Sequence, residues 1–147
     1  MFVGKAFHRI DEKGRLVLPS SFRKALQGDD SVIIAQHEDG CLMLLRESDF
    51  MAMAQERKSD QIAQADTRKQ FRFFASSAQQ LDLDKAGRLL INEEFREFAN
   101  IELGGEVAIT GMVDYAEIWN RARFDVEYSQ GAAGFRVDEN DEEVPPA

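Results

Sequence analysis

The amino-acid sequence predicts an α+β protein, mainly β, made of two tandem β-α-β units. The first observation is an internal repeat: residues 11–26 and 84–99 share six identities among sixteen positions, at a constant offset of 73. Such a repeat dictates architecture, because each copy is one structural unit. The second observation is size, since each unit spans about 50–60 residues and is marginal as an independent core. We therefore expect the two copies to share one core and to close one mixed barrel.

Each copy follows the same order of elements: strand, charged turn, short apolar strand, short helix and β-hairpin. In the first copy, we expect a strand over residues 1–10, a turn over 11–14, a strand over 16–18 ended by Pro19, a helix capped by Ser20 or Ser21 and stopped at 27–30, and hairpin strands over 32–35 and 41–45. In the second copy, we expect a strand over residues 81–84, a turn over 85–87, a strand over 89–91, a helix over 93–100, and hairpin strands over 106–111 and 116–119.

Helical composition is concentrated between the copies. Residues 47–75 are rich in Ala, Gln, Met and charged side chains, which predicts one or two helices with Ser48 as the first cap. We expect few long helices elsewhere. The predicted domain boundaries are 1–58 for the first unit, 59–75 for a connecting helix, 76–128 for the second unit and 129–147 for an acidic, largely flexible tail.

Charge is distributed unevenly along the chain. The net charge of −9 argues, taken globally, against a nucleic-acid partner. However, residues 1–26 carry six basic side chains against two acidic ones, whereas residues 125–147 carry seven acidic side chains against one basic. We therefore expect a basic face at the start of the chain and an acidic region at its end.

The turn is the part of the repeat that suggests chemistry. Its Asp can accept hydrogen bonds from the amides of its own turn, and its Gly permits positive φ. We expect the following Arg to project, exposed, from a rigid turn, and Arg binds phosphate or the guanine edge with two parallel hydrogen bonds. Alternatively, Asp and Arg pair only with each other and stitch the turn. The duplication and the nearby basic residues favour a binding role.

These residues carry a family resemblance. The opening, with Met1-Phe2-x-Gly4 and Asp11-x-Lys13-Gly14-Arg15-Leu16-x-Leu18-Pro19-x-x-Phe22-Arg23, resembles the MraZ family, as does Ala116-Glu117-Ile118-Trp119. The resemblance covers residues 1 to about 125. It implies an AbrB-like, swapped-hairpin, pseudo-twofold double-split β-barrel with flanking helices. It also implies a bacterial transcriptional regulator, at the head of the division and cell-wall gene cluster, that binds short repeats upstream of its own operon and forms ring-shaped homo-oligomers.

The expected DNA-binding residues are Lys5, Arg9, Lys13, Gly14, Arg15 and Arg88, and the expected turn-structuring residues are Asp11, Asp84 and Gly87. The second copy departs from the family pattern, because Asn92 stands where such units usually carry Pro and two Glu follow. We therefore expect the principal DNA contacts in the first copy. The expected partners are double-stranded promoter DNA and further copies of the chain, and the expected location is the cytoplasm, in association with the nucleoid.

Other residue patterns suggest no further chemistry. Cys41 lies in an apolar run and is interpreted as a buried hydrophobe rather than a reactive thiol. His8 and His37 lack metal-ligand spacing, and the acidic run 138–143 is interpreted as solvated rather than metal-binding. Core or subunit contacts are expected at Phe71, Phe73, Phe74 and Trp119. We expect no enzymatic activity, no cofactor and no membrane segment.

A second function remains open at this point: a ring-forming protein-interaction scaffold with weak or no DNA binding. The net charge of −9 and the acidic second copy favour it. Specific, salt-sensitive binding to upstream DNA would favour the regulator instead.

Overall fold

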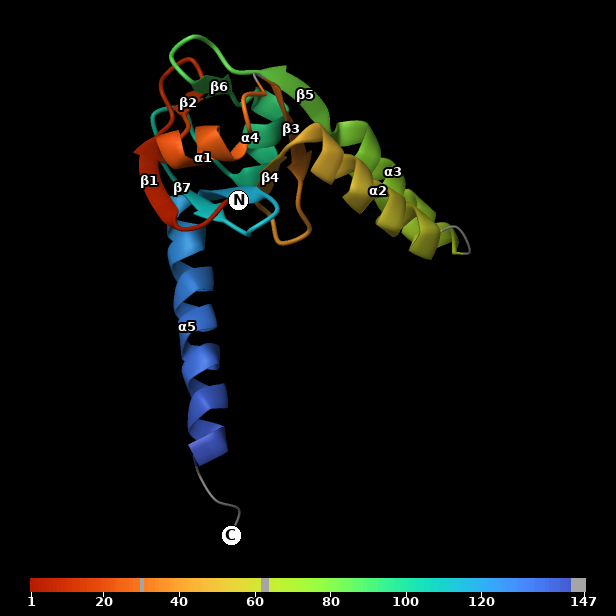
Figure 1. Cartoon of the computed structure of the whole chain (residues 1–147), viewed down its shortest axis with the longest axis vertical. Helices are drawn as coiled ribbons and strands as arrows, with labels where there is room; N and C mark the ends of the chain where they lie inside the picture. The colour runs from red at the N-terminus through yellow and green to blue at the C-terminus, as the bar shows by residue number, and fades with distance from the viewer. Residues whose placement is uncertain (30, 62–63, 144–147) are drawn as a thin grey trace.

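The computed structural model describes residues 1–29, 31–61 and 64–143, and its strands form a six-stranded sheet and a two-stranded ribbon (Figure 1). The strands are β1 (Lys5–Arg9), β2 (Arg15–Val17), β3 (Ser31–Gln36), β4 (Leu42–Leu45), β5 (Gln79–Asp82), β6 (Arg88–Leu90), β7 (Glu106–Gly111) and β8 (Ala116–Asn120). The helices are α1 (Ser20–Ala25), α2 (Glu47–Gln61), α3 (Ala65–Ser77), α4 (Glu93–Ala99) and α5 (Arg121–Glu143). This mixture of helices and antiparallel sheet agrees with the predicted fold class. The expected helix stop at Asp30 and the tail residues 144–147 lie outside the described residues.

The six-stranded sheet is assembled by an exchange of strands between the two halves of the chain. Its order is β1-β7-β8-β4-β3-β5, and every neighbouring pair is antiparallel. β1 pairs with β7 and β5 pairs with β3, so the first strand of each half completes the hairpin of the other. The ribbon likewise joins β2 of the first half to β6 of the second. Neither half can therefore complete its sheet alone.

One hydrophobic core lies between the sheet and the ribbon. Leu16 and Leu89, opposite each other at the centre of the ribbon, are both buried and point into this core. The first helix of each half closes it from the side, with Phe22 on α1 and Phe95 on α4. Phe2 packs edge-to-face against Phe22 at a ring-centroid distance of 5.6 Å. The expectation of one core shared by both copies is confirmed.

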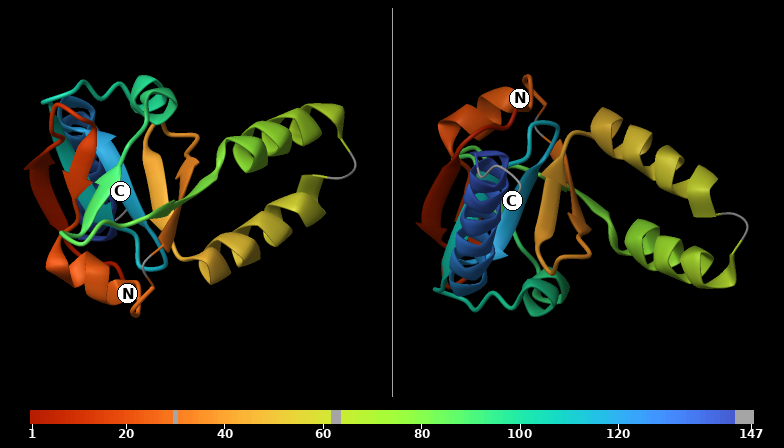
Figure 2. Two further views of the ribbon diagram at one scale, coloured as in Figure 1. Left: turned by 90° about the horizontal axis from the view of Figure 1, so that it is seen from above. Right: turned by 90° about the horizontal axis from the view of Figure 1, so that it is seen from below.

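The predicted barrel does not close among the described residues, where β1 and β5 are the two edges of an open sheet. Each ribbon strand is only three residues long, because the chain enters a helix shortly after it. The two short strands pair with each other. β2 also contacts β1, and β6 contacts β5, but neither contact is a β-ladder that would close the sheet. Seen from above, the ribbon lies between α1 and α4 (Figure 2).

The largest difference from the sequence expectation is α5, a 23-residue helix in place of the flexible tail expected from residue 129. Among the described residues, α5 is the one long helix outside the α2–α3 segment, in agreement with the expectation of few long helices there. Asn120 helps to begin the helix, since its Oδ1 accepts the N–H of Arg123 at 3.1 Å. Gly131 and Gly134 lower helix propensity and obscured the pattern in the sequence. The helix starts against β7 and β8 and extends away from the sheet, on the side opposite the ribbon (Figure 1).

The connecting segment is an α2–α3 helical hairpin rather than one helix, and it projects sideways from the sheet (Figure 2). α2 begins at Glu47, so Ser48 lies inside its first turn and is not its cap. Across the described ranges, no helix has both the length and the apolar composition needed to cross a membrane.

The short helices of the two halves begin differently. The cap position of α1 is Pro19, whose carbonyl accepts the N–H groups of Phe22 and Arg23, so the prediction of a Ser20 or Ser21 cap was wrong. The cap position of α4 is Asn92, whose Oδ1 accepts the N–H of Phe95 at 3.0 Å. Asn92 thus has a structural role in the second copy.

The turn glycines allow a direct test of this packing. Gly14 has φ +84°, and a Cβ there would lie 2.9 Å from the carbonyl oxygen of Ile91. Gly87 has φ +75°, but a Cβ there would first meet the flexible side chain of Arg23. We predict that Gly14→Ala lowers the free energy of unfolding by about 2 kcal/mol or more, and Gly87→Ala by about 1–2 kcal/mol, since a left-handed residue with a Cβ costs about 1–2 kcal/mol.

Urea denaturation of each variant provides the measurement. Gly131→Ala is the matched control, because no heavy atom lies within 4 Å of a Cβ built in that helical position. It should raise stability by up to about 1 kcal/mol. Equal denaturation midpoints for Gly14→Ala and the parent would contradict the described packing.

Candidate nucleic-acid interface

The Asp11 carboxylate organises the first turn. Its Oδ1 accepts the backbone N–H of Lys13 at 2.9 Å and that of Arg15 at 2.8 Å, and its Oδ2 accepts the Nε–H of Arg15 at 2.8 Å. The backbone closes the same turn, since the N–H of Asp11 donates to the carbonyl of Arg15 and the N–H of Gly14 donates to the carbonyl of Asp11. The turn is therefore held rigidly by its own residues.

The second turn repeats this pattern. Oδ1 of Asp84 accepts the backbone N–H of Ala86 and that of Arg88, each at 2.9 Å, and its Oδ2 accepts the Nε–H of Arg88 at 2.7 Å. The same backbone bonds close it, with Gly87 in the position of the first glycine. Because two distant segments form the same structure, the motif itself encodes the turn.

Each Asp occupies only one nitrogen of its Arg. Within the described ranges, the Nη atoms of Arg15 and Arg88 have no hydrogen-bonding or ion-pair partner, and each arginine side chain is 33% exposed. Both interpretations of the turn are therefore compatible. Each Asp pairs with its Arg within the turn, and the same pairing fixes the direction of the guanidinium, whose Nη atoms remain available to a ligand. The arginines are less exposed than we expected, because the pairing holds them along the ribbon.

The turn geometry shifts the acidity of both carboxyls. The pKa of Asp11 falls to about 2, chiefly because its carboxylate accepts the backbone N–H of Arg15, with further contributions from the Arg15 side chain and the N–H of Lys13. The pKa of Asp84 is lowered for the same leading reason, the backbone N–H of Arg88. Both carboxylates are therefore ionised at neutral pH, which is the charge state that accepts these hydrogen bonds.

The ribbon places both arginines on one outer face. In each strand the central leucine is buried and its two neighbours face outward, so the outer face carries Arg15 and Val17 from β2 and Arg88 and Leu90 from β6. In the register, Arg15 lies opposite Leu90 and Val17 lies opposite Arg88. The arginines therefore occupy diagonal corners of a small flat surface, with one turn at each end.

Each turn is also covered by the other half of the chain. The carbonyl of Gly14 accepts the N–H of Ile91 at 2.8 Å, and the carbonyl of Gly87 accepts the N–H of Leu18 at 3.1 Å. Arg96 of α4 lies against Gly14, where its Nη1 also donates to the Ile91 carbonyl at 2.7 Å. The outer face is therefore one composite surface rather than two independent tips.

The structure does not bring all of the predicted residues together. Lys13 lies exposed on the first turn beside Arg15, as expected. Lys5 instead donates from Nζ to the hydroxyl of Tyr128 on α5 at 3.1 Å. Arg9 pairs through Nη2 with Glu106 at 3.0 Å and donates from Nη1 to a loop carbonyl. The ribbon thus unites four of the predicted residues, and the two on β1 are engaged with α5 and β7.

The two ends of the ribbon differ in charge. At the Arg15 end, the first turn meets α4, whose Arg96 lies against Gly14, and residues 11–15 and 91–97 together carry three basic and five acidic side chains. At the Arg88 end, the second turn meets α1, whose Arg23 lies against Gly87, and residues 82–88 and 18–24 together carry four basic and two acidic side chains. The electrostatic surroundings therefore attract an anionic ligand more strongly to the Arg88 end than to the Arg15 end.

A largely buried polar cluster lies on the face of the sheet away from the ribbon, and no spacing in the sequence predicted it. Possible ligand atoms of His37, Cys41 and Glu117 lie within 4.8 Å of one another. His37 Nδ1 accepts the N–H of Asp39, so the neutral ring carries its proton on Nε2, the nitrogen 3.9 Å from Glu117. Glu117 also accepts the indole N–H of Trp119 at 3.0 Å. Burial, together with the Glu117 carboxylate, raises the pKa of the Cys41 thiol well above its usual range. We interpret the cluster as structural, and the prediction that Cys41 is buried is confirmed.

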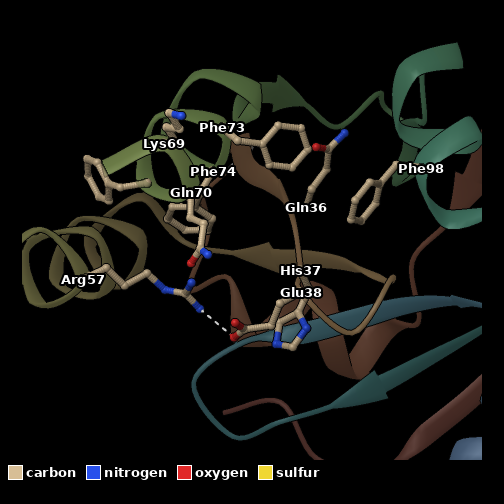
Figure 3. A pocket seen from close by; sticks show the side chains of 10 residues that line it. Gln36, His37, Glu38, Arg57, Lys69, Gln70, Phe73, Phe74 and Phe98 are labelled. Carbon is tan, nitrogen blue, oxygen red and sulfur yellow. Dashed lines mark hydrogen bonds and ion pairs between the residues drawn. The ribbon is translucent and has the colours of Figure 1, made fainter. Parts of the chain in front are cut away.

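A cavity of about 450 Å³ lies between α3, the end of β3 and α4 (Figure 3). The amide of Gln36 extends between the rings of Phe73 and Phe98, whose centroids are 6.2 Å apart. Its Oε1 is buried without a hydrogen-bond partner among the described residues. At the rim, Arg57 pairs with Glu38 at 3.5 Å. This cavity is on a different part of the surface from the ribbon, and nothing in its lining repeats the turn chemistry.

Fold and site together define a class: a duplicated, strand-exchanged α+β protein that presents two Asp-braced arginines on a single ribbon. The family described as "MraZ protein, putative antitoxin-like" matches residues 1–73 and again residues 74–143, and the chain belongs to the MraZ family.

Individual relatives match over most of the chain. A protein named "Transcriptional regulator MraZ" from Desulforamulus reducens is 35% identical over 135 residues, which cover 92% of each chain. Proteins of the same name from Roseiflexus sp. (strain RS-1) and Moorella thermoacetica are 40% and 36% identical, covering 84% and 85% of each chain.

The turn predicts a specific titration. Asp11 should titrate with a midpoint of about 2 in the folded protein, against about 3.9 in the unfolded chain. Because the folded pKa is depressed, the stability contributed by this network is fully present above about pH 4 and is lost as the pH falls through about 2. Carboxyl ¹³C NMR of the folded protein, with the urea-unfolded chain as reference, measures both midpoints. Equal midpoints would show that the turn network does not form in solution.

Proposed function

We propose that this protein is a sequence-specific DNA-binding transcriptional regulator that binds short repeats upstream of its own operon. The observation that carries the proposal is the outer face of the β2–β6 ribbon, where two arginines are braced through Nε and keep their Nη atoms available. A guanidinium held in this way can donate two parallel hydrogen bonds to guanine or to a phosphate. The relatives named as transcriptional regulators support the same role. Such a protein acts in the cytoplasm, in association with the nucleoid.

The ribbon has the dimensions of a DNA-reading element. A two-stranded ribbon fits the major groove of B-form DNA, which is about 12 Å wide. The two turns, at opposite ends of the ribbon, then flank the bases that the outer face meets. In this proposal, Lys13 and Arg15 of the first turn supply the principal contacts and Arg88 supplies the weaker ones, whereas Gly14 is buried and shapes the turn.

We further propose that the chain acts as two tandem units of a double-split barrel, 1–58 and 76–128, joined through the helical hairpin. The strand order of the sheet supports this arrangement, because it is symmetric. If each strand is replaced by its counterpart in the other half (β1 by β5, β3 by β7 and β4 by β8), the order from one edge becomes the order from the other edge. The contacts of the ribbon with β1 and with β5 support it as well, since they connect both edges of the open sheet.

A ring-shaped homo-oligomer is the expected assembly. Three aromatic side chains lie along α5: Phe124 is buried on the sheet, Tyr128 is half exposed and Phe135 is 76% exposed. Phe73 on α3 is also 54% exposed, whereas its neighbour Phe74 is buried. Exposed aromatic side chains on two elements that project in different directions support a heterologous contact, which closes into a ring when the rotation permits.

Arg15→Ala should abolish specific binding to the DNA fragment upstream of the gene, because loss of one base-reading Arg costs about 1–3 kcal/mol per site and an assembly with several ribbons multiplies the loss. Arg88→Ala should cost less. Arg9→Ala is the matched control, since it removes the same charge at a residue paired with Glu106 away from the ribbon. Fluorescence anisotropy at fixed salt measures each affinity, and analytical ultracentrifugation checks the assembly. Parent-like affinity of Arg15→Ala would refute the assignment.

The assembly predicts a second variant pair. Phe135→Ser should dissociate the oligomer, whereas Val126→Ser should leave it intact, because Val126 is 55% exposed but lies outside the groove that α5 forms with the sheet. Sedimentation velocity at micromolar concentration distinguishes the two. A parent protein that sediments as a monomer would contradict the proposed ring.

The alternative function is a ring-forming interaction scaffold with weak or no DNA binding. The acidic composition of the second copy and the net charge of −9 favour it. An intact oligomer that binds the upstream fragment no better than unrelated DNA, at every salt concentration, would support the scaffold over the regulator.

A further inference from the structure

Two exposed apolar side chains share the outer face of the ribbon with the arginines. Val17 is 42% exposed and Leu90 is 52% exposed, although each alternates with a fully buried leucine in a three-residue strand. Leu90 lies directly opposite Arg15, and Val17 lies directly opposite Arg88. Each arginine therefore has an apolar neighbour across the ribbon, supplied by the other half of the chain.

An apolar side chain at this position restricts what the ribbon can meet. Neither Val nor Leu can donate a hydrogen bond to a phosphate, so they add nothing to backbone binding. On the base edges of the major groove, the prominent apolar group is the C5-methyl of thymine, which is contacted by apolar side chains in DNA readers. The minor groove presents no such methyl group.

The spacing of the ribbon suits this contact. Residues i and i+2 of a strand are about 7 Å apart, which is close to two base steps of B-form DNA at about 3.4 Å each. Side chains directly opposite each other across an antiparallel ribbon are about 5 Å apart. An arginine and its apolar neighbour can therefore reach neighbouring bases at the same time.

We propose that Val17 and Leu90 are specificity residues that contact thymine methyl groups beside the bases read by Arg15 and Arg88. This inference rests on the proposed DNA-binding function and adds a chemical requirement to it. The second half of the chain then contributes to reading at the Arg15 end through Leu90, whatever the charge around Arg88.

The test removes only the methyl groups. The DNA fragment immediately upstream of the gene is amplified either with dTTP or with dUTP, which replaces every thymine by uracil and leaves all hydrogen-bonding edges unchanged. The parent protein should bind the uracil fragment more weakly, by about fourfold for each thymine methyl group that the ribbon would otherwise bury, from the transfer free energy of one buried methyl group. Affinities are compared at one salt concentration by fluorescence anisotropy.

The variants assign the effect to the ribbon. The double variant Val17→Ala, Leu90→Ala should bind the thymine fragment more weakly than the parent and should no longer distinguish thymine from uracil. The matched control is Val126→Ala, Met51→Ala, which truncates two exposed apolar residues on α5 and α2, away from the ribbon, and should keep the parent's discrimination. Because all four side chains are exposed, the variants should fold, and circular dichroism melting verifies that they do.

The outcomes separate this inference from the function on which it rests. Equal binding of both fragments by the parent, with Arg15→Ala still abolishing binding, would overturn the methyl contacts and leave the DNA-binding function intact. Discrimination that persists in the Val17→Ala, Leu90→Ala variant would overturn the assignment to these residues. Absence of specific binding to the thymine fragment would overturn both the proposed function and this inference.

Discussion

The exchange of the first strand between the two halves is the interaction on which the rest of the structure depends. Backbone polar groups of a buried strand must be paired, and β3 and β7 each obtain their outer partner from the opposite half. This pairing carries the two charged turns across the molecule, so that β2 and β6 meet over the centre of the sheet. The shared core and the composite outer face are both consequences, because their residues arrive on strands that have crossed over.

The covalent fusion of the two halves permits them to differ where a symmetric dimer could not. Both turns keep the same hydrogen bonds to Asp11 and Asp84, which are needed for the local geometry. The residues after the ribbon have diverged, since Pro19 begins one helix by its backbone and Asn92 begins the other by its side chain. The geometry of the turn is thus retained at both ends, while its electrostatic surroundings are not.

The features that sequence could predict were local ones. The turn followed from Asp11, Gly14 and Arg15, because all of its hydrogen bonds connect residues within five positions of one another. The partners of Lys5 and Arg9 could not be predicted, since Tyr128 and Glu106 approach them only after the strands have exchanged. The same reason applies to the His37, Cys41 and Glu117 cluster, whose members come from separate parts of the chain.

Long elements were predicted less well when their composition was mixed. α5 lacks a continuous apolar stripe, carries two glycines and is highly charged, so its helical propensity competed with signals typical of a flexible segment. The barrel was expected to close because each repeat is marginal as an independent core and because the family resemblance implies a double-split barrel. Here the ribbon strands are too short to extend the ladder, and the open edges are instead flanked by the ribbon.

The unlike ends of the ribbon give this small surface a polarity. A pseudo-twofold backbone would meet a duplex equally well in either of two orientations. The surplus of basic charge lies at the Arg88 end, which adjoins α1, and the surplus of acid lies at the Arg15 end, which adjoins α4. Phosphate contacts carry no sequence information, so this difference in charge would not by itself choose between the two orientations on DNA. A preferred orientation would have to come from side chains that differ between the ends at the level of the bases, as Val17 and Leu90 do.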